Sequence, residues 1–257
     1  MITRNEVLDF ISSYFGEEFF AKARQHDSNA NGLQIIGSDE VKKVALGVGV
    51  DLAFLEKSVE WGANFIIVHH GMNFDGLGQY LGPILQNRLK FIFDHNLTLM
   101  GFHYMLDAHP EIGNNAQTLK KLGTQIVASF SDSWGWVGEF TQAKSLEEVV
   151  SSLEEIFGRE PIKVLEGKKE IKRVAVTSGG GVPRLPQMRE FLDKEIDLYV
   201  TGEVRETTPA LMQEAGINYL AFGHYDSEKF GVMALGDLLK KNFPGLEVEF
   251  IDIPNLF

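Results

Sequence analysis

The sequence predicts an α/β protein built from two similar halves. Two stretches alternate short apolar strands with amphipathic helices, several strands end in glycine and polar residues, and the two stretches share short sequence matches. Strands that alternate with helices in this way are typical of βαβ units and parallel sheets. We expect two intertwined α/β halves, residues 1–127 and 128–257, related by a pseudo-dyad with a metal cleft between them.

The first half opens with a helix. Thr3 and Glu6 form a capping box, and apolar residues at helical spacing continue to Phe15. A polar loop without periodicity follows. The elements expected next are a strand at 33–36, a strand at 44–50, a helix at 52–61, a strand at 64–68, a helix at 83–93, a strand at 98–104 and a helix from 114 to 122.

The second half begins with two strands and a second capping box. Ser145 and Glu148 form that box and start a helix that ends at Phe157. The other expected elements are strands at 125–131, 134–140 and 162–165, then a strand at 174–177, a helix at 185–192, a strand at 198–200, a helix at 208–215, a strand at 219–222, a helix at 228–241 and a strand at 246–251.

Three pairs of segments match between the halves: Lys43-Val44-Ala45 with Arg173-Val174-Ala175, Phe65–Val68 with Asp197–Val200, and Gly101-Phe102-His103-Tyr104 with Phe222-Gly223-His224-Tyr225. In the third pair, a carboxylate follows each histidine by four residues. Since open α/β sheets bind ligands at the carboxyl ends of their strands, a duplication would bring both sets of strand ends to a shared cleft.

Composition limits the chemistry that is available. The chain has 257 residues, no Cys, 24 Lys and Arg and 36 Asp and Glu, for a net charge of −12. Without thiols, a metal site must use His, Asp and Glu. The acidic balance argues against a nucleic-acid partner, which needs clustered cations. Neither a signal peptide nor an apolar run of about 20 residues is present, so we expect a cytoplasmic protein with no membrane association.

Four histidines follow apolar strands: His69, His70, His103 and His224. Imidazole is a common ligand for divalent metals, and Asp107 and Glu228 could bind a cation or orient a ligating ring. Alone, the His69-His70 pair is equally compatible with loop histidines, and each histidine with its carboxylate, His103 with Asp107 or His224 with Glu228, is more typical of a surface turn with a solvated acid. Together they make five or six N/O ligands, too many for one tetrahedral zinc, so they favour a two-metal site.

Several other residues are candidates for the same site. Glu203 follows the strand that matches the one before His69, and we expect it to act there as a base or as support for a ligand. The turn Ser178–Gly181 could cradle an anion or be only a tight turn. Asp27 and its neighbours His26 and Asn31 could contribute from their polar loop. The remaining histidines, 95 and 109, are expected at the surface.

These residues, in this order, resemble the Ngg-one-interacting-factor-three family, whose bacterial members are catalogued as GTP cyclohydrolase 1 type 2 homologues. The resemblance runs from Asp27 to about Gly231. It rests on the segments Asn31-Gly32-Leu33-Gln34, Val68-His69-His70-Gly71, His103 with Leu106-Asp107, Gly113-Asn114-Asn115, Thr201-Gly202-Glu203 and Gly223-His224-Tyr225 with Ser227-Glu228.

The resemblance implies a duplicated α/β protein, commonly a toroidal homohexamer, with two divalent ions per chain. By matching positions it implies the metal ligands His69, His70, Asp107, His224 and Glu228, with Glu228 bridging. His70 and Asp107 would serve one ion, and His69 and His224 the other. His103 would lie beside the metals, where it would contact substrate or support a metal ligand. Zinc, iron, manganese, nickel and magnesium all remain open.

The function expected from this site is a dinuclear metal hydrolase with a small-molecule substrate. For a GTP cyclohydrolase 1 type 2 activity the substrate is a nucleotide, and the guanine ring is opened by water with release of formate. His103 and Glu203 would be the catalytic residues that move protons. The alternatives are a metal-binding scaffold or regulatory interaction protein without turnover, and a two-metal phosphoesterase.

Overall fold

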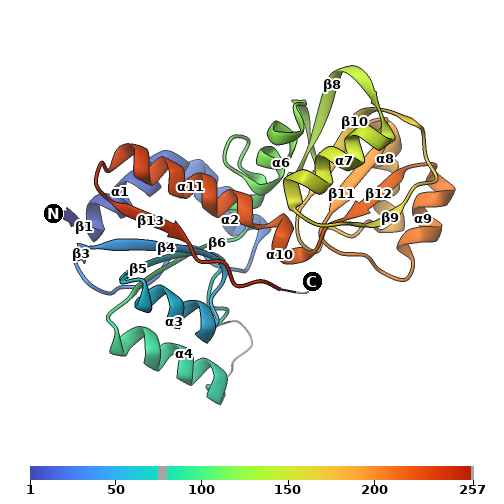
Figure 1. Ribbon diagram of the computed structural model, residues 1–257. Coiled ribbons are helices and arrows are strands. Elements are labelled where there is room, and N and C mark those ends of the chain that lie inside the picture. The colour runs from blue at the N-terminus through green and yellow to red at the C-terminus, as the bar shows by residue number, and fades with distance from the viewer. Residues whose placement is uncertain (75–79, 256–257) are drawn as a thin grey trace. The chain divides into compact units, whose positions relative to one another are not determined.

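The chain folds into two α/β units, and it leaves the first unit and later returns to it. In this computed structural model, which describes residues 1–74 and 80–255, unit 1 contains residues 1–106 and 231–254. Unit 2 contains residues 107–230 and 255–257. Figure 1 shows the return, since the last helix and strand, drawn in red, lie with the blue N-terminal elements. The mixed α/β class predicted from the sequence is confirmed.

Unit 1 is built on a five-stranded sheet in the order β13-β4-β5-β6-β2. Its first four strands are parallel and β2 is antiparallel at one edge. The strands are β13 (Glu247–Phe250), β4 (Lys43–Gly49), β5 (Phe65–His70), β6 (Thr98–Phe102) and β2 (Asn31–Ile35). A separate two-stranded ribbon pairs β1 (Ile2–Thr3) with β3 (Glu40–Val41). The parallel arrangement brings the carboxyl ends of β5 and β6 to the same edge.

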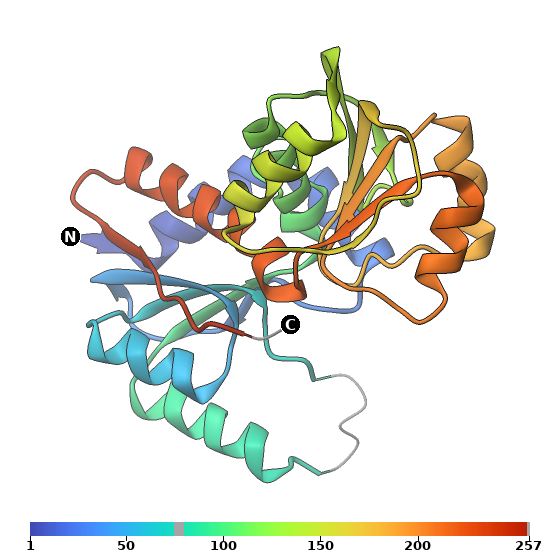
Figure 2. The same cartoon turned by 45° about the vertical axis from the view of Figure 1, so that its right-hand side comes forward.

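Helices cover both faces of this sheet. In Figures 1 and 2, α1 and α11 lie on one face and α3 and α4 on the other. Their bounds are α1 (Arg4–Phe15), α2 (Glu17–His26), α3 (Leu52–Glu60), α4 (Pro83–Asp94) and α11 (Lys229–Asn242). Phe54, Leu55 and Ile92 pack α3 and α4 onto the apolar side chains of β4 to β6. The predicted Thr3–Glu6 capping box is present. Helix α2 was not predicted.

Unit 2 is built on a six-stranded sheet in the order β7-β8-β10-β11-β12-β9. Its centre, β10 to β12, is parallel, and the outer strands are antiparallel. The strands are β7 (Gln125–Phe130), β8 (Gly135–Ser145), β10 (Glu170–Thr177), β11 (Leu198–Thr201), β12 (Asn218–Ala221) and β9 (Ile162–Val164). Strand β8 continues beyond the predicted end at 140, because its second part pairs with the start of β10.

Two apolar layers enclose this second sheet. Leu119, Leu153 and Phe157 belong to the cluster that packs α6 and α7 on one face, and Met188, Phe191 and Met212 belong to the cluster that packs α8 and α9 on the other. The helices are α6 (Asn114–Leu122), α7 (Leu146–Phe157), α8 (Met188–Asp193) and α9 (Thr208–Ala215), with the short η1 (Leu185–Gln187), α5 (Tyr104–Ala108) and α10 (His224–Ser227). The Ser145–Glu148 capping box is present as predicted.

The units repeat one another in local hydrogen bonding as well as in strand order. The backbone N–H of Lys42 donates to Asn64 Oδ1 at 2.9 Å, and that of Lys172 donates to Asp197 Oδ2 at 2.9 Å. Asn64 directly precedes β5 and Asp197 directly precedes β11, so these two residues correspond. Phe65 pairs with Val44, and Leu198 pairs with Val174. The match of Lys43–Ala45 with Arg173–Ala175 therefore agrees with the strand register, whereas the predicted match of Phe65–Val68 with Asp197–Val200 is wrong by one residue.

At the other end, the predicted alignment is wrong by one residue. Phe65 pairs with Thr98 in unit 1, and its equivalent Leu198 pairs with Asn218 in unit 2. His103 lies five residues after Thr98, and Gly223 lies five residues after Asn218, so these two positions correspond. His103 is therefore not equivalent to His224. The strand register, rather than the shared histidine, decides which residues of the two units correspond.

Among the described residues, no helix has the length and apolar character that a membrane span requires.

Candidate metal centre

In unit 1, three imidazole rings gather at the carboxyl ends of β5 and β6. The ring centroids of His69 and His70 are 4.7 Å apart, and those of His69 and His103 are 4.9 Å apart. One nitrogen from each of the three rings lies within 4.8 Å of the others. His69 is fully buried. The predicted convergence of the two adjacent histidines is therefore confirmed, and His103 joins them.

Hydrogen bonds fix which nitrogen two of these rings present. His69 Nδ1 lies 3.0 Å from the carbonyl oxygen of Phe102, and His103 Nδ1 lies 2.8 Å from Asp27 Oδ2. A carbonyl and a carboxylate can only accept, so each Nδ1 carries the proton and donates it. Nε2 is then the atom through which each ring would bind a metal ion. This is the arrangement that metal-binding histidines normally show.

Asp27 is held in place by the polar loop before β2. Its Oδ1 accepts from the backbone N–H of Asn29 at 2.9 Å, and its Oδ2 accepts from Asn31 Nδ2 at 2.9 Å and from the backbone N–H of Tyr104 at 3.0 Å. Burial would raise the pKa of Asp27, but the bonds from His103 and these donors outweigh it and hold the pKa well below its usual range. Asp27 is therefore a fixed anion that orients His103.

The turn after His70 is fastened by Gln34. Its side chain accepts from the backbone N–H of Met72 at 2.8 Å and donates to the Met72 carbonyl at 2.6 Å. A Cβ on Gly71 would lie 2.2 Å from Gln34 Oε1, so only glycine allows this approach. The Asn31–Gln34 segment thus supports the site from both ends. The sequence did not indicate the role of Gln34.

In unit 2, two buried carboxylates lie close together. Asp107 is 5% exposed and Glu228 is 3% exposed, and an oxygen of each lies within 4.8 Å of the other. His224 Nε2 lies 3.1 Å from Glu228 Oε1. Two like charges removed from water repel one another, and a cation between them offsets both the repulsion and the loss of hydration. The carboxylates and the imidazole fit a divalent ion.

Asp107 is oriented by side chains that the sequence analysis did not single out as functional. Its Oδ1 accepts from Asn114 Nδ2 at 3.0 Å and from Ser178 Oγ at 2.6 Å. Asn115 accepts from the backbone N–H of Ser178 at 2.7 Å and donates to the backbone carbonyl of Asp107 at 3.1 Å. Both asparagines are fully buried. In the sequence, the Asn114-Asn115 pair at the start of α6 was the signal that could have indicated these partners of Asp107.

These bonds also decide the question of the Ser178–Gly181 turn. The N–H of Ser178 donates to Asn115, and that of Gly179 donates to Ser227 Oγ at 2.8 Å. Both groups are therefore used within the protein. The turn supports Asp107 and Glu228, which favours the tight-turn alternative over an anion cradle.

His224 carries carboxylates on both ring nitrogens. Its Nδ1 lies 2.7 Å from Glu203 Oε1, which confirms that Glu203 reaches this cluster. Burial lowers the pKa of His224, but the bonds to Glu228 and Glu203 outweigh that and raise the pKa to about 9. The surroundings of this ring thus favour positive charge. A metal ion on the Nε2 side would replace the proton that the ring holds without it.

Gly179 should be essential for metal binding. It has φ +57°, and a Cβ there would lie 2.0 Å from Glu228 Oε1 and 3.0 Å from His224 Nε2. We expect Gly179→Ala to displace Glu228 and weaken metal binding at least about 10-fold, in line with the loss seen when ligand positioning is disturbed. Calorimetric titration with Zn²⁺ or Mn²⁺ measures this.

Gly158→Ala is the matched control for that variant. Gly158 has a similar φ of +71°, but a Cβ there meets nothing within 4 Å. It should lose about 1 kcal/mol of stability from backbone strain and keep its metal affinity. Equal metal affinity in the two variants would show that Glu228 does not depend on this close approach.

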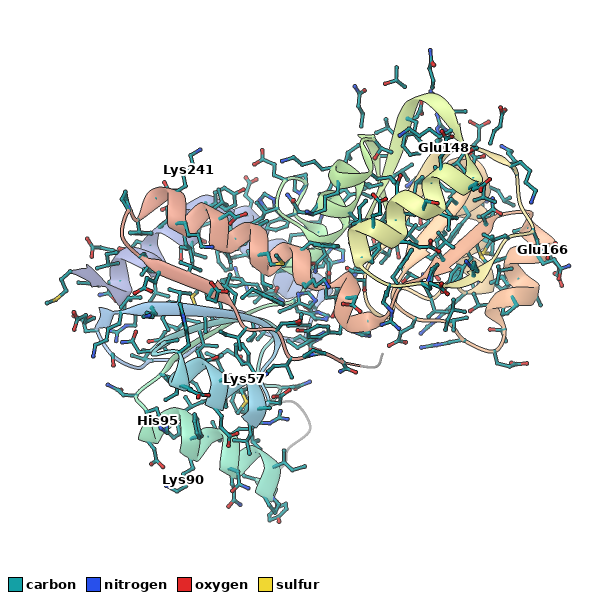
Figure 3. The ribbon with its side chains drawn as sticks, viewed as in Figure 1. Lys57, Lys90, His95, Glu148, Glu166 and Lys241 are labelled. Atoms are coloured by element: carbon teal, nitrogen blue, oxygen red, sulfur yellow. The ribbon has the colours of Figure 1, made fainter. Side chains whose placement is uncertain are left out.

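Among the described residues, the candidate metal groups do not include His26, His95 or His109. His95 ends α4 on the surface, as predicted, and Figure 3 shows it near Lys90. His109 was predicted at the surface but is only partly exposed, because its Nδ1 accepts from the backbone N–H of Glu111 at 3.1 Å. Burial lowers the pKa of His109 accordingly. His26 stacks on Tyr104 with the ring planes 5° apart.

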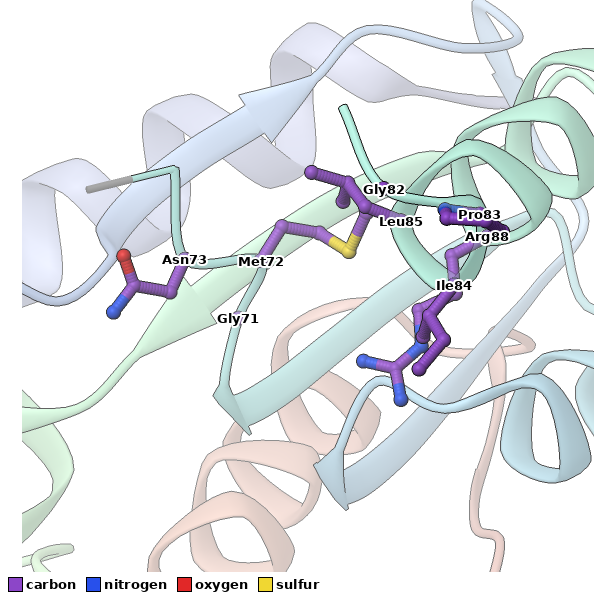
Figure 4. A pocket seen from close by; sticks show the side chains of 8 residues that line it. All are labelled: Gly71, Met72, Asn73, Gly82, Pro83, Ile84, Leu85 and Arg88. Atoms are coloured by element: carbon purple, nitrogen blue, oxygen red, sulfur yellow. The ribbon is translucent and has the colours of Figure 1, made fainter. Parts of the chain in front are cut away.

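A pocket of about 400 Å³ lies in unit 1 beyond the His70 turn. Figure 4 shows Met72 and Asn73 on one side and the start of α4, from Pro83 to Arg88, on the other. Arg88 is the charged side chain among the described residues that line it. The lining residues that the structure describes therefore add no imidazole or carboxylate to the site.

Comparison with known proteins places these features in a family. The family model for Duf34/NIF3 (NGG1p interacting factor 3) matches residues 6–255. A "GTP cyclohydrolase 1 type 2 homolog" of Archaeoglobus fulgidus is 36% identical, with 93% of this chain and 96% of the relative covered. The protein of that name from Escherichia coli K12 is 37% identical, with 89% and 91% covered.

Solved structures agree with this assignment. The structure titled "Structural genomics, protein ybgI, unknown function" superposes with a TM-score of 0.84 at 34% identity, covering 99% of each chain. TTHA1606 from Thermus thermophilus superposes with a TM-score of 0.84 at 29% identity, covering 100% of each. From its sequence and its fold, the chain belongs to the Duf34/NIF3 family.

Proposed function

We propose that the chain is a dinuclear metal-dependent hydrolase. Two divalent ions would be held by His69, His70, Asp107, His224 and Glu228. The observation that carries the proposal is the pair of buried carboxylates, Asp107 and Glu228, within 4.8 Å of one another. Such a pair is costly without a cation. The clustered imidazoles of unit 1 supply the type of nitrogen ligand that zinc, iron, manganese and nickel accept.

The residues around the ligands suit proton transfer. Two divalent ions supply Lewis acidity, which polarises a substrate and activates water as a nucleophile. His103 presents Nε2 toward His69 and His70 while Asp27 holds its Nδ1, so it is placed to take or return a proton. Glu203 holds Nδ1 of His224. We assign His103 and Glu203 as the proton-moving residues.

For the reaction, we propose hydrolytic opening of the guanine ring of GTP with release of formate. Two relatives are named "GTP cyclohydrolase 1 type 2 homolog", and this name supports the choice of substrate. We also propose that the protein is cytoplasmic and forms a toroidal homohexamer, in keeping with the family resemblance.

The test is an assay of metal-loaded protein with GTP for formate and with p-nitrophenyl phosphate for phosphate. A His70→Ala, Glu228→Ala double variant removes two proposed ligands. His95→Ala, which changes an exposed histidine on α4, is the control. Formate release that is lost in the double variant and kept in the control supports the proposal.

The other outcomes overturn it in favour of the alternatives. Phosphate release with the same dependence on the ligands would identify a two-metal phosphoesterase. Tight metal binding with no turnover of either substrate would identify a metal-binding scaffold, as the words "interacting factor" in the family's name suggest. Fewer than two ions per chain after loading, by elemental analysis, would overturn the dinuclear assignment.

A further inference from the structure

A second pocket of about 400 Å³ lies within unit 2, directly beside His224. Its floor is formed by residues that follow β11 and β12, including Gly202 and Gly223. Its wall comes from Arg159, in the connection between α7 and β9, and from Ile162, the first residue of β9. The pocket thus occupies the carboxyl edge of the parallel strands, where open α/β sheets bind ligands. Its volume suits one small organic molecule.

The lining has an apolar part and two polar parts. Ile162, which is 58% exposed, provides apolar surface together with Val204 and Ala221. Glu203 and His224 line the pocket and are hydrogen-bonded to one another. Arg159 adds a guanidinium to the lining. A bound molecule would therefore meet apolar surface, the proposed metal ligand and a guanidinium at once.

Arg159 is fixed in position and keeps most of its donors. Its NH1 group donates to Asp226 Oδ2 at 3.0 Å, and Asp226 Oδ1 accepts from Lys229 Nζ at 2.8 Å. Two cations thus share one carboxylate, so Asp226 does not neutralise both of them. A guanidinium has five N–H donors in a planar fork that matches carboxylate and phosphate groups. The arrangement holds the fork still and leaves it open to an anion.

We propose that this pocket binds the anionic group of a small organic substrate, a phosphate or a carboxylate, through Arg159. The apolar body of that molecule packs on Ile162 and Val204, and its other end reaches His224. The site is specificity-determining: it selects molecules that carry a negative charge at this distance from the proposed ions. The inference rests on the proposed function only in treating the bound molecule as the substrate.

Binding is tested with three probes that share one ring: phenyl phosphate, benzoate and the neutral benzamide. Calorimetry on the full chain, with and without Mn²⁺, gives their affinities. We expect both anions to bind at least 10-fold more tightly than benzamide. The stronger of the two identifies the anion as phosphate or carboxylate. Benzamide binding as tightly as the anions would overturn the proposal.

The variants are Arg159→Gln, Arg159→Lys and, as control, Arg189→Gln, whose side chain is 88% exposed on α8. Arg159→Gln should weaken binding of the preferred anion at least 10-fold, and Arg159→Lys should restore part of the loss. Arg189→Gln should bind as the wild type. Melting curves and metal content should stay unchanged in all three, since Lys229 still pairs with Asp226.

The two proposals fail in distinguishable ways. Anion binding that depends on Arg159 in a protein that holds no ions would support this pocket and overturn the dinuclear function. Two bound ions with anion binding unchanged in Arg159→Gln would overturn this pocket alone.

Discussion

Glu228→Gln should remove most of the metal affinity and leave the fold intact. The substitution keeps the shape of a side chain that is 3% exposed but removes one of two neighbouring buried negative charges. We expect the dissociation constant for Zn²⁺ or Mn²⁺ to rise at least about 100-fold, the upper end of the loss seen when only the support of a ligand is removed. Calorimetric titration and elemental analysis of the loaded protein measure this.

The same variant tests whether Glu228 binds metal or only stabilises the fold. Without metal, Glu228 lies within 4.8 Å of an oxygen of Asp107 and 3.1 Å from His224 Nε2. Replacing it with a neutral amide relieves the repulsion from Asp107 and removes the ion pair with His224, two effects of opposite sign. In excess chelator, the free energy of unfolding should therefore differ little from that of the wild type. The wild type should gain stability when ions are added, and the variant should not.

Glu206→Gln is the control, because it neutralises an exposed carboxylate that lies just after Glu203. It should bind metal as the wild type does. A Glu228→Gln protein that holds two ions at wild-type affinity would contradict the assignment of Glu228. So would a large loss of stability in chelator, which would make Glu228 a structural residue.

Local signals in the sequence were sufficient for most of the elements. The two capping boxes, at Thr3 and Ser145, join residues three positions apart, so they can be recognised without the fold. Helix α2 was missed because Gly16, with φ +75°, separates it from α1, and only Ala23 of its ten residues is buried. Most of its residues are charged or polar, so the segment has less of the apolar content that marks α1 in the sequence.

The partners of the site residues could not be predicted, because they are distant along the chain. Asp107 is 71 residues from Ser178, and His103 is 76 residues from Asp27. The sequence showed that polar residues follow several strands, and parallel strands bring such ends to one edge. It did not show which oxygen faces which nitrogen. That depends on strand register, which also corrected the alignment of His103 with His224 to one with Gly223.

Asp27→Asn should both slow turnover and destabilise the protein. Asp27 is an acceptor on both oxygens: Oδ1 faces the N–H of Asn29, and Oδ2 faces the N–H of Tyr104. An asparagine must turn its NH₂ group toward one of these donors, whichever way it is oriented. Leaving buried donors unsatisfied costs about 1–3 kcal/mol, which urea unfolding measures.

The expected loss of kcat has a separate cause. The carboxylate of Asp27 keeps the proton of His103 on Nδ1. An amide carries no negative charge, so it no longer offsets the positive charge that the His103 ring gains when Nε2 takes up a proton. For a proton-moving residue we expect kcat to fall about 100-fold, with KM and metal content little changed. Asp39→Asn, at a carboxylate that is 72% exposed, should have no effect on either quantity.

The stability difference should also depend on pH in a defined direction. The folded-state pKa of Asp27 lies below its unfolded value, so its contribution is complete above about pH 4 and falls as pH drops toward the folded-state pKa. The gap in unfolding free energy between wild type and Asp27→Asn should thus be constant from pH 5 to pH 7, the range roughly above the unfolded carboxyl pKa. It should shrink below about pH 4. A gap that widens on acidification would show that Asp27 is not a fixed anion in the folded protein.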